Sequence, residues 1–181
     1  MQEIQELIFA HGGVLSGSFV RDVIIRGEDF LPSKVSRDVD VLITFSSALE
    51  LLDEVRVKYP SCEIIPLSFS EEDKILHYHI QLTEVLLDVF AGSDEEHTYL
   101  CSPDADVNCL CYDGQGFFLW YPVLEENYGL GMDEHHIIER ILKKEAVLLV
   151  HEWEEEEKED IMKDRISKLA NKGWTFSGPK P

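Results

Sequence analysis

Three aspartates in strand-like segments are the residues of this sequence best suited to chemistry. Asp38 and Asp40 lie two apart in RDVDVLITF, which alternates acidic and aliphatic residues as a β-strand does. Their carboxylates therefore project from one face, and two close carboxylates repel one another without a cation. Asp88 lies in LLDVF, where an unpaired carboxylate inside an apolar strand is costly. If the two strands are neighbours, the three acids form one metal site.

Magnesium is the metal that this donor set favours, with manganese as the alternative, because magnesium binds a few carboxylates together with substrate phosphates. Two such ions about 3.5–4 Å apart activate an attacking oxygen and stabilise a leaving pyrophosphate. Each acid also has an ordinary interpretation when taken alone. Asp38 and Asp40 fit an exposed strand face, and Asp88 fits a strand end that faces solvent.

Gly17 and Ser18 come directly before a predicted helix, FVRDVIIRG, whose apolar residues form one stripe and whose last residue, Gly27, ends it. The first N–H groups of a helix favour anions, and a glycine lets a phosphate approach closely. A phosphate-binding turn is therefore expected at residues 17–18. Small residues before a helix are also common caps, so this signal is weak by itself.

The remaining pattern predicts an α/β (α+β) fold with a mixed sheet, flanking helices and a helical C-terminal segment. Helices are expected over residues 2–10 and 46–59, the second capped by its serines. Strands are expected at 62–69, 74–82 and 84–90, and a hairpin over 106–121 turns at 113–116. From about Asp133 onward the pattern is helical. Residues 1–125 are predicted to form the core, with residues 126–181 packed on it.

Cysteines and histidines give weaker signals. Cys109 and Cys111 alternate along an apparent strand, but no CxxC pair supports a zinc site, so small core residues are predicted. His77 and His79 share one strand face, whereas the adjacent histidines at 135–136 cannot share a helical face. Ordinary surface or core histidines are predicted in all these positions.

The net charge of −20, with 36 acidic and 16 Lys or Arg residues, argues against an extended nucleic-acid surface. A small acceptor or a basic protein partner fits better. The longest apolar stretch, Gly116 to Leu124, is far shorter than the roughly 20 residues that span a bilayer. The N-terminus is acidic where a signal peptide is basic. No membrane association and an intracellular, cytoplasmic setting are therefore expected.

Three segments together resemble the polymerase-β-like nucleotidyltransferase superfamily, and most closely the head domain of tRNA CCA-adding enzymes and bacterial poly(A) polymerases. SGSFVRDVIIRG is similar to the GGxVRDxLLG segment of that family, and RDVDVLIT to its DxDxxT strand. DADVNCLCYDGQG resembles its DFTINALAYDxxG segment. The resemblance covers roughly residues 12–120. It implies a nucleotidyltransferase core.

The resemblance also implies residues that bind the nucleotide. Gly17 and Ser18 would hold the triphosphate of a nucleoside triphosphate (NTP). Arg21 would help there or form a salt bridge with Asp22. Asn108 matches the asparagine of the third segment and would contact the nucleotide or its sugar. Two arginines that precede this segment in the family are replaced by residues 102–103, Ser and Pro.

The implied activity is transfer of a nucleoside monophosphate to an acceptor hydroxyl. Asp38 and Asp40 would bind both metal ions, and Asp88 would hold the ion on the acceptor side. The acceptor is open: a small RNA end, a protein or a small molecule. A second interpretation is a nucleotidyltransferase-fold protein that has lost activity and serves as a binding or regulatory module. A third takes residues 151–160, HEWEEEEKED, as a surface for a basic partner, against the common case of a solvated helix face.

Overall fold

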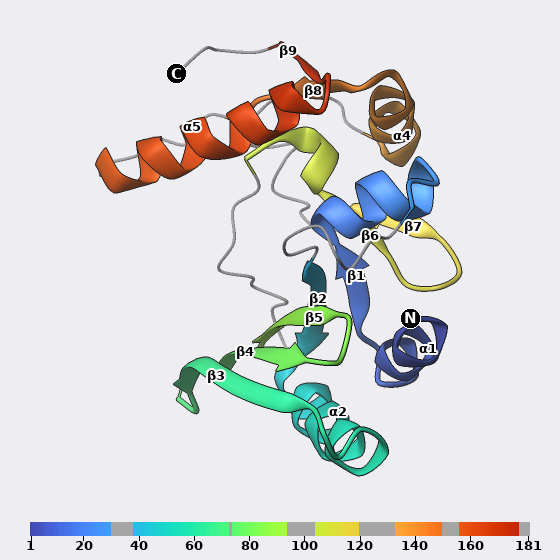
Figure 1. Cartoon of the computed structure of the whole chain (residues 1–181), viewed down its shortest axis with the longest axis vertical. Helices are drawn as coiled ribbons and strands as arrows, with labels where there is room; N and C mark the ends of the chain where they lie inside the picture. The colour runs from blue at the N-terminus through green and yellow to red at the C-terminus, as the bar shows by residue number, and fades with distance from the viewer. Residues whose placement is uncertain (30–37, 73, 94–103, 120–132, 150–155, 178–181) are drawn as a thin grey trace. The chain divides into compact units, whose positions relative to one another are not determined.

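The computed structural model describes residues 1–29, 38–72, 74–93, 104–119, 133–149 and 156–177 (Figure 1). The chain divides into two compact units. The first comprises Met1–Ser102 and Cys111–Phe118, and the second comprises Pro103–Leu110 and Leu119–Pro181. The predicted domain boundary near residue 125 lies outside the described residues. The α/β class was predicted correctly, and none of the described helices is both long and apolar enough to cross a bilayer.

A mixed sheet of seven strands organises the first unit, in the spatial order β3-β4-β5-β2-β1-β6-β7. Strands β2 and β5 are parallel neighbours, whereas β1 pairs antiparallel with β2 and β6, and β4 pairs antiparallel with β3 and β5. The bounds in spatial order are Glu63–Ser70, Ile75–Gln81, Leu86–Gly92, Asp38–Thr44, Val14–Ser16, Leu110–Tyr112 and Phe117–Leu119.

The two faces of the central strands differ in burial. On β2, β4 and β5 every second residue is apolar and buried, as alternation of side chains along a strand requires. Helix α2 (Phe45–Lys58) packs against these three strands, and helix α1 (Gln2–Ala10) adds three buried residues to the same core (Figure 1). Most of the polar residues on these strands lie in the other half of the alternation and are only partly buried. They include Asp38, Asp40, His77, His79 and Asp88.

Helix α2 begins earlier than the sequence predicted. Its first residue is Phe45 and its N-cap is Thr44, which makes no side-chain capping hydrogen bond, so the prediction of a serine cap was wrong. Phe45 is buried in the core and its ring lies 6.2 Å from that of Phe69. Burial of a large aromatic ring contributes more than the approximately 1 kcal/mol of a typical cap, so core packing decides where the helix starts.

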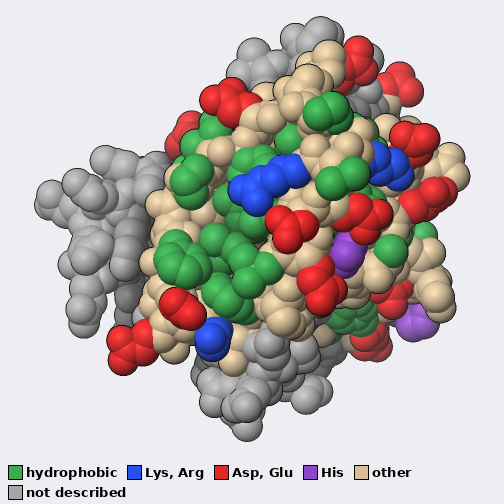
Figure 2. Space-filling view, turned by 90° about the horizontal axis from the view of Figure 1, so that it is seen from below, with side chains coloured by type: hydrophobic (Ala, Val, Ile, Leu, Met, Phe, Trp, Pro, Cys, Tyr) green, Lys and Arg blue, Asp and Glu red, His purple; other side chains and the backbone are tan. Residues whose placement is uncertain are grey.

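Strand β3 forms one edge of the sheet and keeps large apolar side chains exposed. Ile65, Leu67 and Phe69 on β3 are exposed, as are Leu49 and Val57 on α2. Figure 2 shows apolar side chains gathered on one face of the molecule, with acidic side chains around them. Among the described residues, the sheet therefore ends in an edge strand with an apolar surface.

The second unit contains helices α4 (Glu134–Lys143) and α5 (Glu156–Asn171) and a short parallel pair, β8 (Glu145–Val147) with β9 (Thr175–Ser177). The sequence predicted a helical pattern from about Asp133 onward, and β8 contradicts it at Glu145–Val147. Lys144 adopts a left-handed conformation with φ +58° and ends α4. The apolar residues 146–149 that follow are buried in an extended segment. A helix made of such a run would have no polar face to turn toward solvent.

The predicted hairpin over 106–121 is shorter than expected. Its arms are β6 and β7, whereas Asp106–Asn108 form a single 3-10 turn, η2. Asp106 explains the difference. Its fully buried carboxylate accepts hydrogen bonds from the backbone N–H groups of Val107 and Val147, at 2.9 and 2.7 Å, and from the Arg140 side chain. Burial raises the pKa of Asp106 above its ordinary value, against the lowering effect of these hydrogen bonds.

Replacement of Asp106 by alanine should destabilise the second unit by roughly 3 kcal/mol, because it leaves two buried N–H groups and a guanidinium without their acceptor. Urea denaturation monitored by circular dichroism measures this loss. The matched control is Asp164→Ala, which removes an exposed acid paired with Lys168 and should cost under about 0.5 kcal/mol. Equal losses in the two variants would contradict the anchoring role of Asp106.

Candidate metal centre

Three carboxylates converge on one face of the sheet in the first unit. Asp38 and Asp40 come from β2 and Asp88 from β5, and one oxygen of each lies within 4.8 Å of one oxygen of both others. The parallel register places Asp40 directly opposite Asp88. Strand alternation had predicted this convergence, and it is confirmed. We call these three residues the acid cluster.

The acid cluster is electrostatically costly without a counter-charge. Unit charges about 4 Å apart interact by roughly 1 kcal/mol in water and by several times more in a less polar environment. All three residues are partly buried, and the Asp88 side chain is 16% exposed. Each remains open to solvent and therefore to an ion or a phosphate. The arrangement suits a divalent cation, since carboxylate oxygens are the ligands of magnesium.

Two histidines of β4 contact the same cluster. His77 Nε2 lies 2.7 Å and His79 Nε2 3.4 Å from Asp88 Oδ1. Both were predicted to be ordinary histidines, so this contact was missed. It depends on the pairing of β4 with β5, which follows a turn in which the N–H of Leu82 donates to the carbonyl of Val85. A tight turn at these residues sets a register that places His79 opposite Asp88.

Gly17 lies directly beside the acid cluster. Strand β1 pairs Ser16 with Asp40, and the chain then turns at Gly17 with φ +65°. A β-carbon at Gly17 would lie 2.0 Å from Oδ2 of Asp40. The glycine is therefore needed for its left-handed backbone and for the space that the carboxylate occupies. Ser18 follows as the N-cap of η1 (Phe19–Ile25), which is a π-helix. Their contact with a triphosphate stays a prediction.

Arg21 and Asn108, the other two predicted nucleotide-binding residues, have protein partners. Arg21 is 4% exposed and donates through two nitrogens to Asp22, at 2.7 and 2.9 Å, which is the salt bridge that the sequence analysis gave as an alternative. Asn108 belongs to the second unit, where its amide donates to Asp104 at 2.6 Å. Residues 102–103, which replace the family's two arginines, lie outside the described residues.

The cysteines add no ligand to the acid cluster among the residues that the structure describes. Cys109 and Cys111 are both buried, as predicted for small core residues. Cys109 follows the η2 turn and is not on a strand, so the predicted alternation of the pair was wrong.

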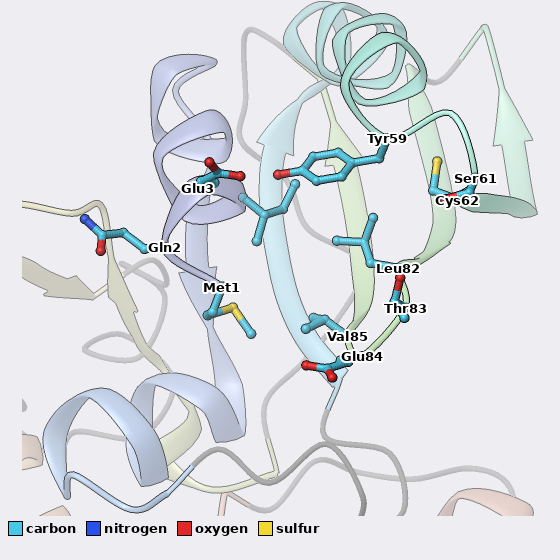
Figure 3. Close-up of a pocket in the computed structure, with 11 residues that line it drawn as sticks. Met1, Gln2, Glu3, Tyr59, Ser61, Cys62, Leu82, Thr83, Glu84 and Val85 are labelled. Carbon is cyan, nitrogen blue, oxygen red and sulfur yellow. The ribbon is translucent and has the colours of Figure 1, made fainter.

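A separate hollow of about 440 Å³ lies in the first unit (Figure 3). It is bordered by the start of α1, the residues after α2 and the turn between β4 and β5. Figure 3 shows Tyr59, Leu82 and Val85 around it. Val85 belongs to the buried core, and the hollow shares no residue with the acid cluster.

Neither a protein-family model nor a curated protein sequence matches this chain. The function of this chain is therefore inferred from the geometry of the site and the chemistry of its residues.

A β-carbon at Gly17 should damage the acid cluster specifically. Gly27 provides the matched control, because it has the same φ of +65° and no atom within 4 Å of an added β-carbon. Gly27→Ala should cost about 1–2 kcal/mol of stability for the left-handed backbone alone. Gly17→Ala should cost about 1–3 kcal/mol more, because Asp40 must move. Urea denaturation of both variants measures the difference, and equal costs would contradict the contact with Asp40.

Proposed function

We propose that this chain is a magnesium-dependent nucleotidyltransferase that moves a nucleoside monophosphate from an NTP to an acceptor hydroxyl. One observation carries the proposal: Asp38, Asp40 and Asp88 meet within 4.8 Å, on adjacent parallel strands. The backbone of Gly17 lies against the carboxylate of Asp40 and precedes the start of η1. A cation site next to an anion-binding helix terminus is the combination that a triphosphate with its metal requires.

The chemistry follows from the positions of these groups. An acceptor oxygen forms a bond to the α-phosphorus, the bond between the α-phosphorus and the bridging oxygen breaks, and pyrophosphate leaves. Magnesium, when bound, supplies neutralisation of the phosphate charge and activation of the acceptor hydroxyl. Asp38 and Asp40 would bind both metal ions. Asp88 would hold the ion on the acceptor side and would receive the hydroxyl proton. Gly17 and Ser18 orient the phosphates through their backbone N–H groups.

The acceptor that fits best is small or is a protein. The net charge of −20 repels a polyanion, and long nucleic acids need many Lys and Arg contacts for binding. An NTP avoids this difficulty, because its own charge is largely neutralised by the metal ions. A short RNA end remains within the proposal, since only its last nucleotides need to enter the site.

A second candidate function is an inactive nucleotide-binding or regulatory module. The observation that favours it is the engagement of Arg21, whose guanidinium is buried in an ion pair with Asp22. A buried arginine does not reach a triphosphate from that position. Binding without transfer would identify this function.

Asp38→Asn and Asp40→Asn should each abolish nucleotide transfer. The assay incubates the protein with magnesium, each of the four α-labelled NTPs, and a panel of RNA ends, proteins and small hydroxyl compounds. Loss of one metal-binding carboxylate should lower the rate by at least about 100-fold, the scale on which transition-state charge stabilisation acts. Asp53→Asn is the control, because it removes an exposed carboxylate of α2. Binding of NTP with no transfer by the wild type would favour the inactive module instead.

The same substitution in the acid cluster should stabilise the metal-free protein. Asp38→Asn removes one of three repelling charges, which should raise the free energy of unfolding by on the order of 1 kcal/mol in the presence of EDTA. Magnesium should raise the melting temperature of the wild type, because it binds the native state, and should raise that of the variant less. A thermal scan with and without magnesium measures both effects. The absence of any magnesium shift in the wild type would remove the metal-binding hypothesis.

A further inference from the structure

The geometry points to a second metal site, formed by His77, His79 and Asp88 and suited to a borderline divalent ion such as Zn²⁺. It lies beside the acid cluster and shares Asp88 with it. The site goes beyond the proposed function and does not depend on it, because its two nitrogen ligands take no part in nucleotide transfer as proposed above.

The three ligand atoms are already close together. The imidazole Nε2 atoms of His77 and His79 lie 2.7 and 3.4 Å from Oδ1 of Asp88, and one donor atom of each residue lies within 4.8 Å of those of both others. Zinc bonds of about 2.0–2.2 Å place tetrahedral ligand atoms roughly 3.4 Å apart. The His79 contact already has this spacing. The His77 contact needs to open by roughly 0.7 Å, which a small rotation of the side chains supplies.

The fold positions these ligands by three independent means. His77 and His79 lie two apart on β4, so both rings project from the same face of the sheet. Antiparallel pairing places His79 opposite Asp88 and His77 opposite Phe90. The ring of His77 stacks on that of Phe90, with centroids 3.9 Å apart and an interplanar angle of 17°. The stacked ring is thereby oriented before any ion arrives, which reduces the entropy lost on binding.

The donor set distinguishes this group from the acid cluster. Three carboxylates offer only oxygen, which magnesium prefers, whereas imidazole nitrogen favours zinc and other first-row transition metals. Three protein ligands also leave a fourth position open for water or a substrate oxygen, as in catalytic zinc sites. The side chains of His77 and His79 are 23% and 29% exposed, so an ion can reach them from solvent.

A purely structural role is the alternative explanation of the same contacts. Each histidine would then only hydrogen-bond to Asp88 and offset the charge of the acid cluster. That role predicts a loss of stability when a histidine is removed, but no affinity for zinc. Metal binding therefore separates the two explanations.

The test is calorimetric titration of the untagged, full-length protein with Zn²⁺, with Co²⁺ as a spectroscopic probe. The wild type should bind zinc, and its cobalt complex should show the strong visible absorption of a four-coordinate site. His77→Gln and His79→Gln should each weaken zinc binding at least about 10-fold, the low end of the loss caused even by an outer-shell partner. Circular dichroism in EDTA verifies folding, and if one variant unfolds the other carries the test.

Two control variants make the result specific. His11→Gln removes a histidine that also contacts a carboxylate, with Nε2 2.8 Å from Glu54, and should leave zinc affinity unchanged. Asp38→Asn should lower zinc affinity less than either histidine variant, although it weakens the magnesium response. This pattern supports the second site even if no nucleotide transfer is found.

Four results would overturn the inference. The first is that the wild type does not bind zinc, and the second is that both histidine variants bind zinc with wild-type affinity. The third is that Asp38→Asn loses as much zinc affinity as the histidine variants. The fourth is an intense near-ultraviolet thiolate band in the cobalt complex. The third result would assign zinc to the acid cluster, and the fourth would assign it to the cysteines.

Discussion

The parallel pairing of β2 with β5 is the constraint on which the first unit depends. It joins seven consecutive residue pairs, from Asp38 with Leu86 to Thr44 with Gly92. The pairing places Val39, Val41 and Ile43 on the core face, and Asp38 and Asp40 beside Asp88 on the other face. A slip of one residue in either strand would turn its aspartates into the core and its aliphatic residues outward. Packing against α2 and assembly of the acid cluster are therefore specified by the same register.

The two faces of the sheet have opposite effects on the free energy of folding. Burial of apolar side chains against α1 and α2 stabilises the fold, whereas the gathering of three carboxylates opposes it. The histidines of β4 offset part of that cost by contacting Asp88. A bound cation would offset the rest. Such a concentration of like charge at one place is expected where a protein binds an ion or a charged substrate, because the rest of the fold supplies the stability that the site consumes.

Several residues that resemble a nucleotidyltransferase motif have structural partners. Arg21 forms an ion pair with Asp22 inside the first unit. In the second unit, Asp106 accepts a hydrogen bond from the backbone N–H of Val147. Asn108 donates to Asp104 in that same unit. Burying such polar residues requires particular partners, which these contacts supply. The positions with proposed chemical roles are instead the partly exposed ones, in the acid cluster and on β4.

The amino-acid sequence by itself determined the local features of this protein. Alternation in RDVDVLITF and LLDVF specified two strands and the faces of their aspartates, and helical periodicity specified α1 and most of α2, because these patterns act within a few residues. Features that depend on distant partners were decided only by the tertiary structure. These are the start of α2 at Phe45, the end of α4 at Lys144, and the contact of His77 and His79 with Asp88. Each depends on packing or strand register between separate segments, which local pattern does not encode.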